Sequence, residues 1–325
     1  MKVRDLLRDA EAKLTEAGVP NAAYDARIML EEAYGKTSAE LLMELDRSLC
    51  PGATGGTEPA GGQQCPGDCG AMLTYRASVS QRLRRVPLQQ IIGHAGFMGL
   101  DFKVNRHVLV PRQDTETLVE TVLETEKDKD IRLLDLCTGS GCIAISLKYY
   151  GGYRDVTMSD KDRDALHVAI RNASIQKTEI RAVQSDLFEA FRTSDTDADQ
   201  EKAEATGNAG EAGSDAGASF EAERFDVIVS NPPYIRSDVI ETLDPEVRDH
   251  DPRIALDGGA DGLDFYRRIL KEARGHLVPG GRIWLEIGYD QAEDVTRIAQ
   301  ENGYTGITVR KDLAGLDRVV GAALP

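Results

Sequence analysis

The residues best suited to chemistry lie in one short segment, residues 230–234, where an asparagine precedes two prolines and a tyrosine. Each proline restricts the residue before it and fixes its own backbone angle, so the segment is held extended. The carboxamide of Asn231 and the carbonyl of Pro232 then form two rigid acceptors, and the ring of Tyr234 packs beside them. Such a pair suits a planar amino group, with one acceptor for each hydrogen. We favour this site over a proline turn without a ligand, because the segment directly follows an expected strand.

A glycine turn forms the second candidate site. Gly139 and Gly141 lie between an apolar run and a helical pattern, where the backbone can approach a ligand and a helix N-terminus offers unpaired N–H groups. Asp135 and Thr138 stand beside this turn and are further candidates for cofactor binding. With Ala144 the segment also fits the G-x-G-x-x-A pattern of dinucleotide enzymes. The turn predicts a cofactor, and a tight turn without a ligand remains the alternative.

Two carboxylates follow the next two expected strands. Asp160 comes directly after residues 155–159, where a carboxylate can accept both hydroxyls of an adenosine ribose. Asp186 follows residues 180–184, where the carboxylate or its neighbours would face an adenine edge. A helix N-terminal acid and an ordinary Asx-turn are the structural alternatives. These residues predict a nucleoside cofactor and leave its identity open.

The elements that must position these residues follow two patterns. Between residues 6 and 49 the apolar residues recur at helical spacing with breaks at 18–21 and 34–38, which predicts a small helical bundle. A further helix is expected at 73–85 and a strand pair at 96–110.

Beyond Pro111 strands alternate with helices, which predicts an α/β fold with a mostly parallel sheet. The last two strands have no helix between them, so we expect the final one to be antiparallel. The expected strands are 131–136, 155–159, 180–184, 225–229, 282–287, 305–310 and 318–322, and the helices are 142–150, 162–176, 263–276 and 290–301.

Length and charge narrow the class of protein. A chain of 325 residues predicts about two domains. Lys and Arg total 39 against 55 Asp and Glu, a net charge of −16, whereas proteins held by phosphate contacts normally have the opposite balance. The charged start is unlike a secretory signal, and no apolar run is long enough for a bilayer. We expect a cytoplasmic protein that binds neither nucleic acid nor membrane.

Two segments interrupt the pattern. The stretch at about 50–72 is rich in Gly and Pro and holds Cys50, Cys65 and Cys69, while the acidic stretch at about 191–223 has almost no large apolar side chains and is expected to be disordered. Because no fourth ligand stands near the cysteines, reduced thiols are favoured over a zinc site, and no metal is expected. The expected domains are 1–90, a strand-pair linker at 91–112, and 113–325.

These motifs together resemble the Rossmann-like, seven-stranded class I methyltransferases that use S-adenosylmethionine to modify planar amino groups. Their hallmark is the same Asn-Pro-Pro-Tyr segment after the fourth strand, which DNA adenine methyltransferases share. The segments 110–116, 254–263, 285–291 and 312–318, with the N-terminal bundle and the region 93–110, are similar to the family that methylates peptide chain release factors on glutamine, the PrmC/HemK family. The resemblance covers nearly the whole chain except the two interruptions.

The resemblance implies methyl transfer from S-adenosylmethionine to the glutamine amide of the Gly-Gly-Gln motif in release factors, which supports translation termination. It makes residues 1–90 a substrate-binding domain. We expect the enzyme to be a monomer. An adenine methyltransferase and a non-catalytic cofactor-binding protein are the alternatives. The implied catalytic residues are Asn231, Pro232 and Tyr234; the substrate-binding residues are these with Pro233, Arg112 and Glu116; and the cofactor-binding residues are Asp135, Thr138, Gly139, Gly141, Asp160, Asp186 and Asn231.

Two departures from the family pattern bear on this site. Cys137 stands where the family usually has glycine at the first position of its turn, which adds a side chain near the methionine end of the cofactor. Gln113 stands where the family usually has proline, although Arg112 and Glu116 are kept. We expect a modest change in cofactor affinity and no loss of activity.

Overall fold

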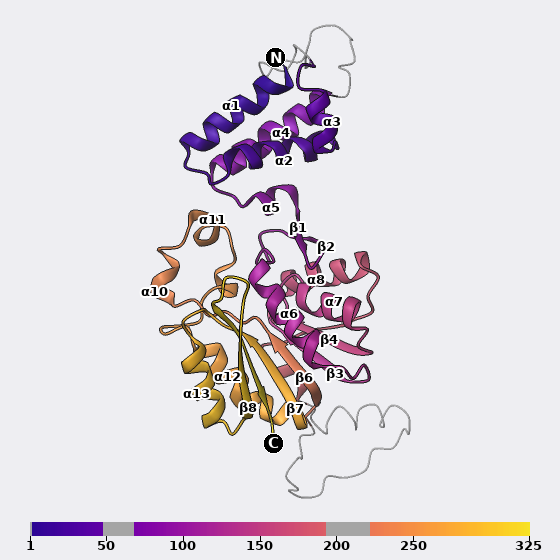
Figure 1. Ribbon diagram of the computed structural model, residues 1–325, viewed down its shortest axis with the longest axis vertical. Coiled ribbons are helices and arrows are strands. Elements are labelled where there is room, and N and C mark those ends of the chain that lie inside the picture. The colour runs from indigo at the N-terminus through magenta and orange to yellow at the C-terminus, as the bar shows by residue number, and fades with distance from the viewer. Residues whose placement is uncertain (1, 48–67, 193–221) are drawn as a thin grey trace, which may run out of the picture. The chain divides into compact units, whose positions relative to one another are not determined.

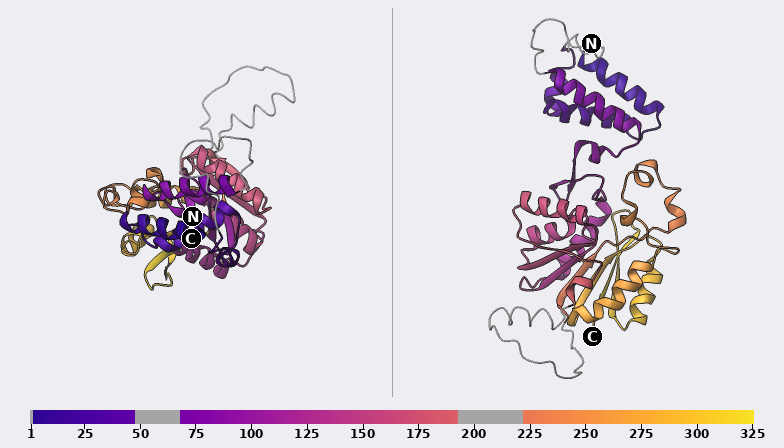
Figure 2. Two further views of the ribbon diagram at one scale, coloured as in Figure 1. Left: turned by 90° about the horizontal axis from the view of Figure 1, so that it is seen from above. Right: turned by 180° about the vertical axis from the view of Figure 1, so that it is seen from behind.

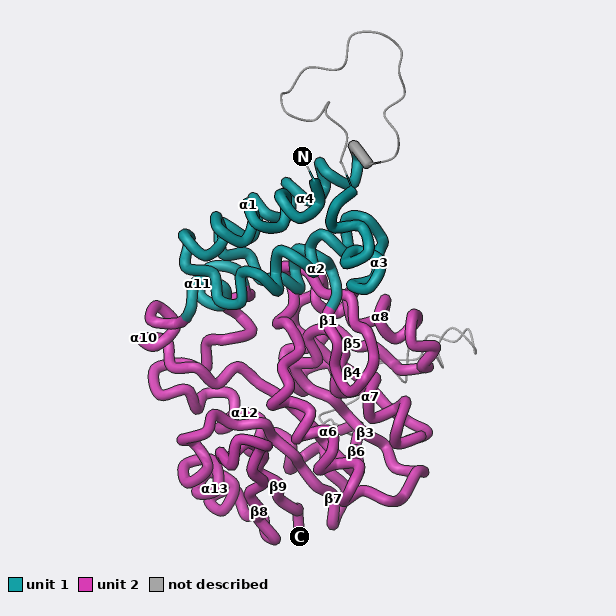
Figure 3. Tube along the Cα trace, turned by 45° about the horizontal axis from the view of Figure 1, so that its top comes forward, with its two compact units in different colours: residues 1–94, 244–250 teal, residues 95–243, 251–325 magenta. Residues whose placement is uncertain are grey.

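The computed structural model describes residues 2–47, 68–192 and 222–325 (Figure 1). The chain divides into two compact units, coloured separately in Figure 3: unit 1 is Met1–His94 with Asp244–His250, and unit 2 is Ala95–Leu243 with Asp251–Pro325. The expected features at Cys50, Cys65 and most of 191–223 lie outside the described residues. Within those ranges, no helix combines the length and apolar character needed to cross a membrane.

Unit 1 is a helical bundle, as the apolar spacing predicts. Leu6, Ala10 and Leu14 recur every four residues on α1 and are buried against Met29 and Leu30 of α2. The helix expected at 73–85 begins earlier, at Asp68. The helices of unit 1 are α1 (Val3–Glu16), α2 (Ala22–Tyr34), α3 (Ser38–Met43), α4 (Asp68–Leu83), α5 (Leu88–Ile92) and α11 (Pro245–Arg248).

A buried ion-pair cluster ties the late segment 244–250 into unit 1. The Arg82 guanidinium lies 2.6 Å from the Asp25 carboxylate and 2.8 Å from Glu246, and both Arg82 and Asp25 are almost fully buried. Arg85 also contacts Glu246, at 2.6 Å. Burial raises the pKa of Asp25, and the hydrogen bond from Arg82 opposes that rise. Each charge in the cluster has an opposite partner, which offsets the cost of its burial.

Unit 2 is built on a seven-stranded sheet in the order β5-β4-β3-β6-β7-β9-β8. All neighbouring strands from β5 to β7 are parallel, and β9 is antiparallel to both β7 and β8, which confirms the prediction for the last strand. The strands are β3 (Arg132–Leu136), β4 (Asp155–Asp160), β5 (Arg181–Gln184), β6 (Phe225–Ser230), β7 (Leu277–Glu286), β8 (Thr305–Lys311) and β9 (Asp317–Ala323). The expected pair is β1 (His94–Phe97) and β2 (Leu100–Lys103).

Helices cover both faces of the sheet (Figures 1 and 2). Because successive strand residues point to opposite faces, Leu133 and Val229 join a core with α6, α7 and α8, whereas Leu134, Leu136 and Ile228 join a core with α12 and α13. The helices are α6 (Gln113–Thr125), α7 (Cys142–Ser146), α8 (Arg163–Ile175), α10 (Ser237–Ile240), α12 (Asp264–His276) and α13 (Ala292–Glu301). The helix expected at 142–150 changes to a π-helix at Leu147–Gly151.

The strand order creates a switch point between β3 and β6. From β3 the chain proceeds outward to β4 and β5, then returns to add β6 on the other side of β3. Leu136 and Ser230, the last residues of these strands, are paired in parallel register. The segments that follow them, which hold the glycine turn and Asn231, therefore leave the sheet side by side, where open α/β sheets bind ligands.

Replacing Arg82 with alanine should destabilise unit 1 by about 3–5 kcal/mol, because it leaves the buried carboxylate of Asp25 without its cation, while Glu246 keeps Arg85. Urea unfolding followed by circular dichroism measures this loss. The only tryptophan, Trp284, lies in unit 2, so its fluorescence follows that unit separately.

The matched control is Lys13→Ala, which breaks a pair with Asp9 whose two side chains are each 55% exposed. We expect a change within about 0.5 kcal/mol. Equal unfolding midpoints for the two variants would contradict the importance of the buried cluster.

Candidate active site

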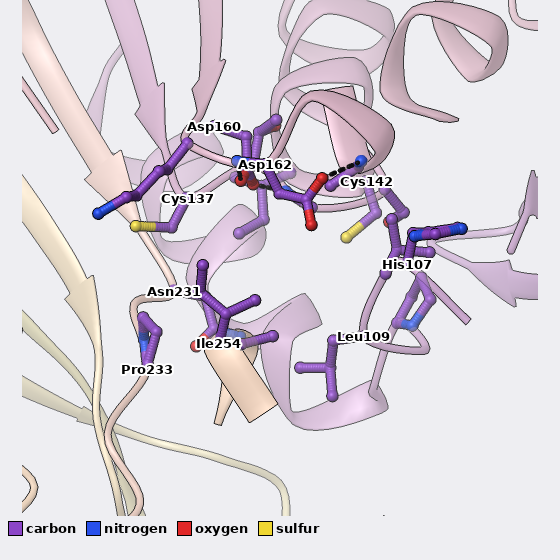
Figure 4. A pocket seen from close by; sticks show the side chains of 18 of the residues that line it. His107, Leu109, Cys137, Cys142, Asp160, Asp162, Asn231, Pro233 and Ile254 are labelled. Carbon is purple, nitrogen blue, oxygen red and sulfur yellow. Dashed lines mark hydrogen bonds between the residues drawn. The ribbon is translucent and has the colours of Figure 1, made fainter. Parts of the chain in front are cut away.

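A pocket with about 930 Å³ of open space lies at the carboxyl ends of β3, β4, β5 and β6 (Figure 4). One wall is apolar and includes Val108, Leu109 and Ile143. The structure brings seven of the predicted site residues to its lining: Arg112, Thr138, Gly139, Asp160, Asp186, Asn231 and Pro233. The expected nucleoside site and the expected amino-group site thus share one cavity.

Asp160 connects the glycine turn to the end of β4. Its Oδ2 accepts the N–H of Gly139 at 2.9 Å, and its Oδ1 accepts the N–H of Asp162 at 2.9 Å. Burial raises the pKa of Asp160, and these backbone donors counteract the rise. A carboxylate has about four lone-pair sites, so each oxygen can still accept a further hydrogen bond from a ligand hydroxyl.

Asp135 and Gly141 lie behind the turn and do not line the pocket. The Oδ2 of Asp135 accepts from Thr138 Oγ1 at 2.5 Å and from the N–H of Ala144 at 3.2 Å, and complete burial raises its pKa to about 7. At Gly141, a Cβ would lie 2.9 Å from Ile145 Cδ1, so this glycine is required for packing against α7. Both residues support the turn from the protein side.

The donor pattern distinguishes between the cofactors that the sequence leaves open. The N–H groups of Gly139 and Ala144, which could bind a pyrophosphate, are already donated to carboxylates. Asp160, Asp162 and Asp186 also line the cavity, although Lys161 pairs with Asp186 at 2.6 Å. This arrangement suits a nucleoside with hydroxyl donors and a cationic side chain, which are the features of S-adenosylmethionine, better than an anionic dinucleotide.

The corner at 231–234 is fixed from several sides. The amide Nδ2 of Asn231 donates to Thr115 Oγ1 at 3.3 Å, which leaves the amide oxygen as an acceptor. Gln291 donates to the carbonyl of Tyr234 at 3.0 Å, and a Cβ on Gly258 would lie 2.7 Å from the Cα of Tyr234. The close packing of this glycine explains why a glycine-rich segment follows the corner in the sequence.

Three other predicted site residues lie outside the lining of the pocket. Tyr234 does not line the pocket, and its hydroxyl donates to Glu286 Oε1 at 3.4 Å. Glu116 also lies off the pocket and accepts the N–H of Met98 at 2.6 Å, which ties α6 to the turn between β1 and β2. Pro232 is buried outside the lining, whereas Arg112 is part of it.

Sequence reasoning gave no role to Thr115, Glu286 or Gln291, which hold the corner in place. The segments 110–116 and 285–291 contain all three, so the signal was present without an assigned function. In the described ranges, no group of three or more His, Cys, Asp and Glu side chains could hold a metal ion.

Comparison with known proteins shows which family this chain resembles. The Methyltransferase small domain matches residues 113–200 and the PrmC N-terminal domain matches residues 5–54. A release factor glutamine methyltransferase of Geobacter sulfurreducens is 34% identical over 99% of this chain and 96% of its own length. One from Clostridium acetobutylicum is 35% identical, covering 98% of each chain.

A solved protein-(glutamine-N5) methyltransferase (release factor-specific) from Alicyclobacillus acidocaldarius is 28% identical, covers 69% of this chain and 99% of its own, and has a TM-score of 0.34. The sheet order, the pocket and the Methyltransferase small domain match define the class, a Rossmann-like methyltransferase that depends on S-adenosylmethionine. The two sequence relatives match nearly the whole of this chain at 34% and 35% identity. The chain therefore belongs to the release factor glutamine methyltransferase family.

Cys137, at the position where glycine is usual in the family, adopts a left-handed backbone with φ of 58°. A residue other than glycine in this backbone conformation lowers stability by about 1–2 kcal/mol. Glycine avoids that strain, but it loses more conformational entropy on folding, which offsets part of the gain. Cys137→Gly should therefore be more stable than Cys137→Ala by about 0.5–1 kcal/mol. Both variants lose the sulfur, so the difference in urea midpoint by Trp284 fluorescence isolates the strain, and equal midpoints would disprove it.

Alanine at Gly139 and at Gly141 should give different results, although both glycines have a left-handed backbone, with φ of 54° and 81°, where a side chain costs about 1–2 kcal/mol. A Cβ on Gly139 has no protein atom within 4 Å, so Gly139→Ala should weaken cofactor binding about tenfold and lower stability by this strain alone. Gly141→Ala should lower stability by about 1–3 kcal/mol more, because its Cβ also meets Ile145 and Ala169. Calorimetric titration and thermal unfolding measure the two effects, and a reversed order would refute these roles.

Proposed function

We propose that this protein transfers a methyl group from S-adenosylmethionine to the side-chain amide nitrogen of the glutamine in the Gly-Gly-Gln motif of class I release factors. It acts in the cytoplasm as a monomer and supports translation termination. Residues 1–90 contribute the surface that binds the release factor, and the pocket of unit 2 holds the cofactor beside the corner at 231–234. The proposal is supported by membership of the family and by the geometry of this corner.

The observation that carries the proposal is the orientation of Asn231. Because its Nδ2 donates to Thr115, its Oδ1 is available to accept one hydrogen of a substrate amide. The carbonyl of Pro232 accepts the other, since the two prolines hold that carbonyl at a fixed angle. Two acceptors on one –NH2 group select a planar amino group, such as that of a primary carboxamide, and fix the plane in which it lies.

In this proposal the protein promotes methyl transfer mainly by positioning the substrate amide. S-adenosylmethionine supplies the reactive methyl group on a sulfonium. The substrate nitrogen is a poor nucleophile because its lone pair is delocalised into the carbonyl, so Asn231 and Pro232 must hold the amide with its nitrogen directed at the methyl group. Such positioning contributes roughly 7–11 kcal/mol in favourable intramolecular reactions. The same two acceptors stabilise the positive charge that develops on nitrogen.

The remaining site residues take supporting roles in this proposal. Asp160 accepts the ribose hydroxyls, and Asp186 with its neighbours faces the adenine. Thr138 and Gly139 form the wall beside the methionine part. Pro233 and Arg112 complete the lining around the substrate glutamine, while Tyr234 and Glu116, which lie off the pocket, hold the corner and α6 in place.

The direct experiment is incubation of purified class I release factor with the protein and S-adenosylmethionine, followed by mass spectrometry. The expected result is a gain of about 14 Da, the mass of one CH2, on the Gly-Gly-Gln glutamine. A parallel incubation with DNA and RNA over a range of salt concentrations tests the adenine alternative. Transfer to nucleic acid without transfer to release factor would refute the proposal, and so would cofactor binding without transfer to either.

Asn231→Ala should lower kcat by at least about 100-fold while changing the cofactor Kd little, because it removes a hydrogen bond made to the reacting amide. Asn302→Ala is the control, since Asn302 only caps α13 by donating to the carbonyl of Ile298. Single-turnover kinetics and calorimetry measure the two quantities. A variant at position 231 that keeps the full rate would overturn the mechanism.

A further inference from the structure

A cluster of exposed apolar side chains lies at the carboxyl end of the sheet, the edge that also holds the pocket. Leu313 and Leu316 belong to the turn between β8 and β9, where Leu313 is fully exposed and Leu316 is 44% exposed. Because β9 is antiparallel to β7, it begins where β7 ends, with Val319 opposite Glu286. The same register, continued past β7, brings Tyr289, which is 62% exposed, to the level of Leu316. Leu313, Leu316 and Tyr289 form the apolar tip.

Hydrogen bonds hold the turn of the apolar tip in one conformation. The carboxylate of Asp312 accepts the N–H groups of Ala314 at 2.9 Å and of Leu316 at 3.0 Å. The N–H of Asp312 also donates to the carbonyl of Leu316 at 2.8 Å, and Gly315, with φ of 80°, closes the turn. The turn therefore keeps Leu313 on the outside, with its side chain in solvent.

Arg318 joins this turn to the segments around the pocket. Its buried guanidinium donates to Asp312 Oδ2 at 3.0 and 3.1 Å and to the carbonyl of Ile287 at 3.2 Å. It also lies 3.5 Å from the carboxylate of Asp114 on α6, the residue before Thr115, which accepts the hydrogen bond from Asn231. A partner that contacts the apolar tip is therefore held at a fixed distance from the substrate corner.

The charges next to the turn are already paired. Lys311 lies 2.6 Å from Asp317, and Arg318 lies 3.0 Å from Asp312. The tip thus presents apolar area without an unpaired charge of these four residues. Such a surface suits an apolar patch on a protein, whereas the phosphates of a nucleic acid require free cations.

The size of the substrate explains why a contact outside the pocket is needed. The pocket has about 930 Å³ of open space, which suits a cofactor and one amide side chain, so the body of a substrate protein must lie against the edge around it. Single exposed leucines are common on protein surfaces, but here three apolar side chains lie together on that edge. A rigid turn also loses little conformational freedom on binding, so the area it buries favours affinity.

We propose that the apolar tip is a docking surface for the release factor, with Leu313 entering an apolar depression on that protein. This inference rests on the proposed function and adds a contact by which the enzyme recognises the folded substrate in addition to its glutamine. Because Leu313 does not touch the reacting atoms, its effect should appear in the KM for release factor and leave kcat unchanged.

The kinetic test compares Leu313→Ser and Leu313→Met with the wild type. Leu313→Ser should raise the KM for release factor about tenfold, because a leucine is no longer buried on binding, with kcat and the cofactor Kd unchanged. Leu313→Met keeps an apolar side chain of similar size and should restore the KM. Methyl transfer to release factor at a range of concentrations measures both constants.

A short substrate separates docking from a structural effect. The turn is two strands away from β6, or about 10 Å along the sheet, whereas a pentapeptide centred on the substrate glutamine extends about 7 Å to either side. The pentapeptide should therefore be methylated with the same kcat/KM by the wild type and by Leu313→Ser. An equal loss with the pentapeptide and with release factor would contradict docking.

Ile175→Ser is the matched control. Ile175 is 45% exposed and is the last residue of α8, which runs from the carboxyl end of β4 back to the amino end of β5. It therefore lies at the opposite end of the sheet, and its variant should keep the KM of the wild type. If Leu313→Ser also keeps it, the apolar tip is not a docking surface.

Other occupants of the tip give different results. A urea midpoint of Leu313→Ser below that of the wild type, by Trp284 fluorescence, would show that Leu313 packs on its own chain. A wild type that sediments as a dimer and a Leu313→Ser variant that sediments as a monomer would assign the tip to a second copy. Either result would overturn the inference.

Calorimetric titration of release factor into each variant does not depend on turnover. Leu313→Ser should weaken binding about tenfold, and Ile175→Ser should not. If these shifts are found but the wild type transfers no methyl to release factor, the proposed function fails while the docking surface stands. If the wild type methylates release factor and both variants bind it equally well, the docking surface fails and the proposed function stands. A wild type that does not bind release factor would overturn both.

Discussion

The site depends on the parallel pairing of β3 with β6. The register that sets Leu136 opposite Ser230 makes both strands end at the same level, and Ser230 Oγ also donates to the carbonyl of Leu136 at 2.7 Å. The turn that receives the cofactor and the asparagine that receives the substrate amide therefore start from adjacent backbone positions. A shift of one residue would reverse the face of every side chain on the strand and separate the two halves of the site.

Two buried carboxyl groups hold the segments at this edge of the sheet in place. Asp135 and Glu286 each have one oxygen without a partner among the described residues, and burial raises the pKa of both to about 7. Burying such groups is unfavourable for stability. What they provide is orientation, since Asp135 holds the glycine turn through Thr138 and Ala144, and Glu286 holds the corner through the hydroxyl of Tyr234.

Local sequence patterns were sufficient to predict most strands and helices. They also predicted the site residues that follow strand ends directly and line the pocket. The start of β7 at Leu277 was missed because Pro279, Gly280 and Gly281 look like a turn, although the strand continues past an irregular pairing opposite Phe225. The support of Asn231 by Thr115 joins residues 116 positions apart, and no local pattern reports such a contact. The period of two along β3 could have shown that Asp135 shares a face with Leu133, toward α7.

The assignment of residues 244–250 to the helical unit limits how this molecule can be divided. A fragment that ends at His94 lacks Glu246, so the guanidinium groups of Arg82 and Arg85 lose their shared anion. A fragment that begins after His94 contains residues 244–250 but lacks Arg82 and Arg85, which pair with Glu246. Neither unit is an exchangeable module at a single cut, and a chimaera that grafts the helical unit onto another relative must transfer both pieces of sequence together.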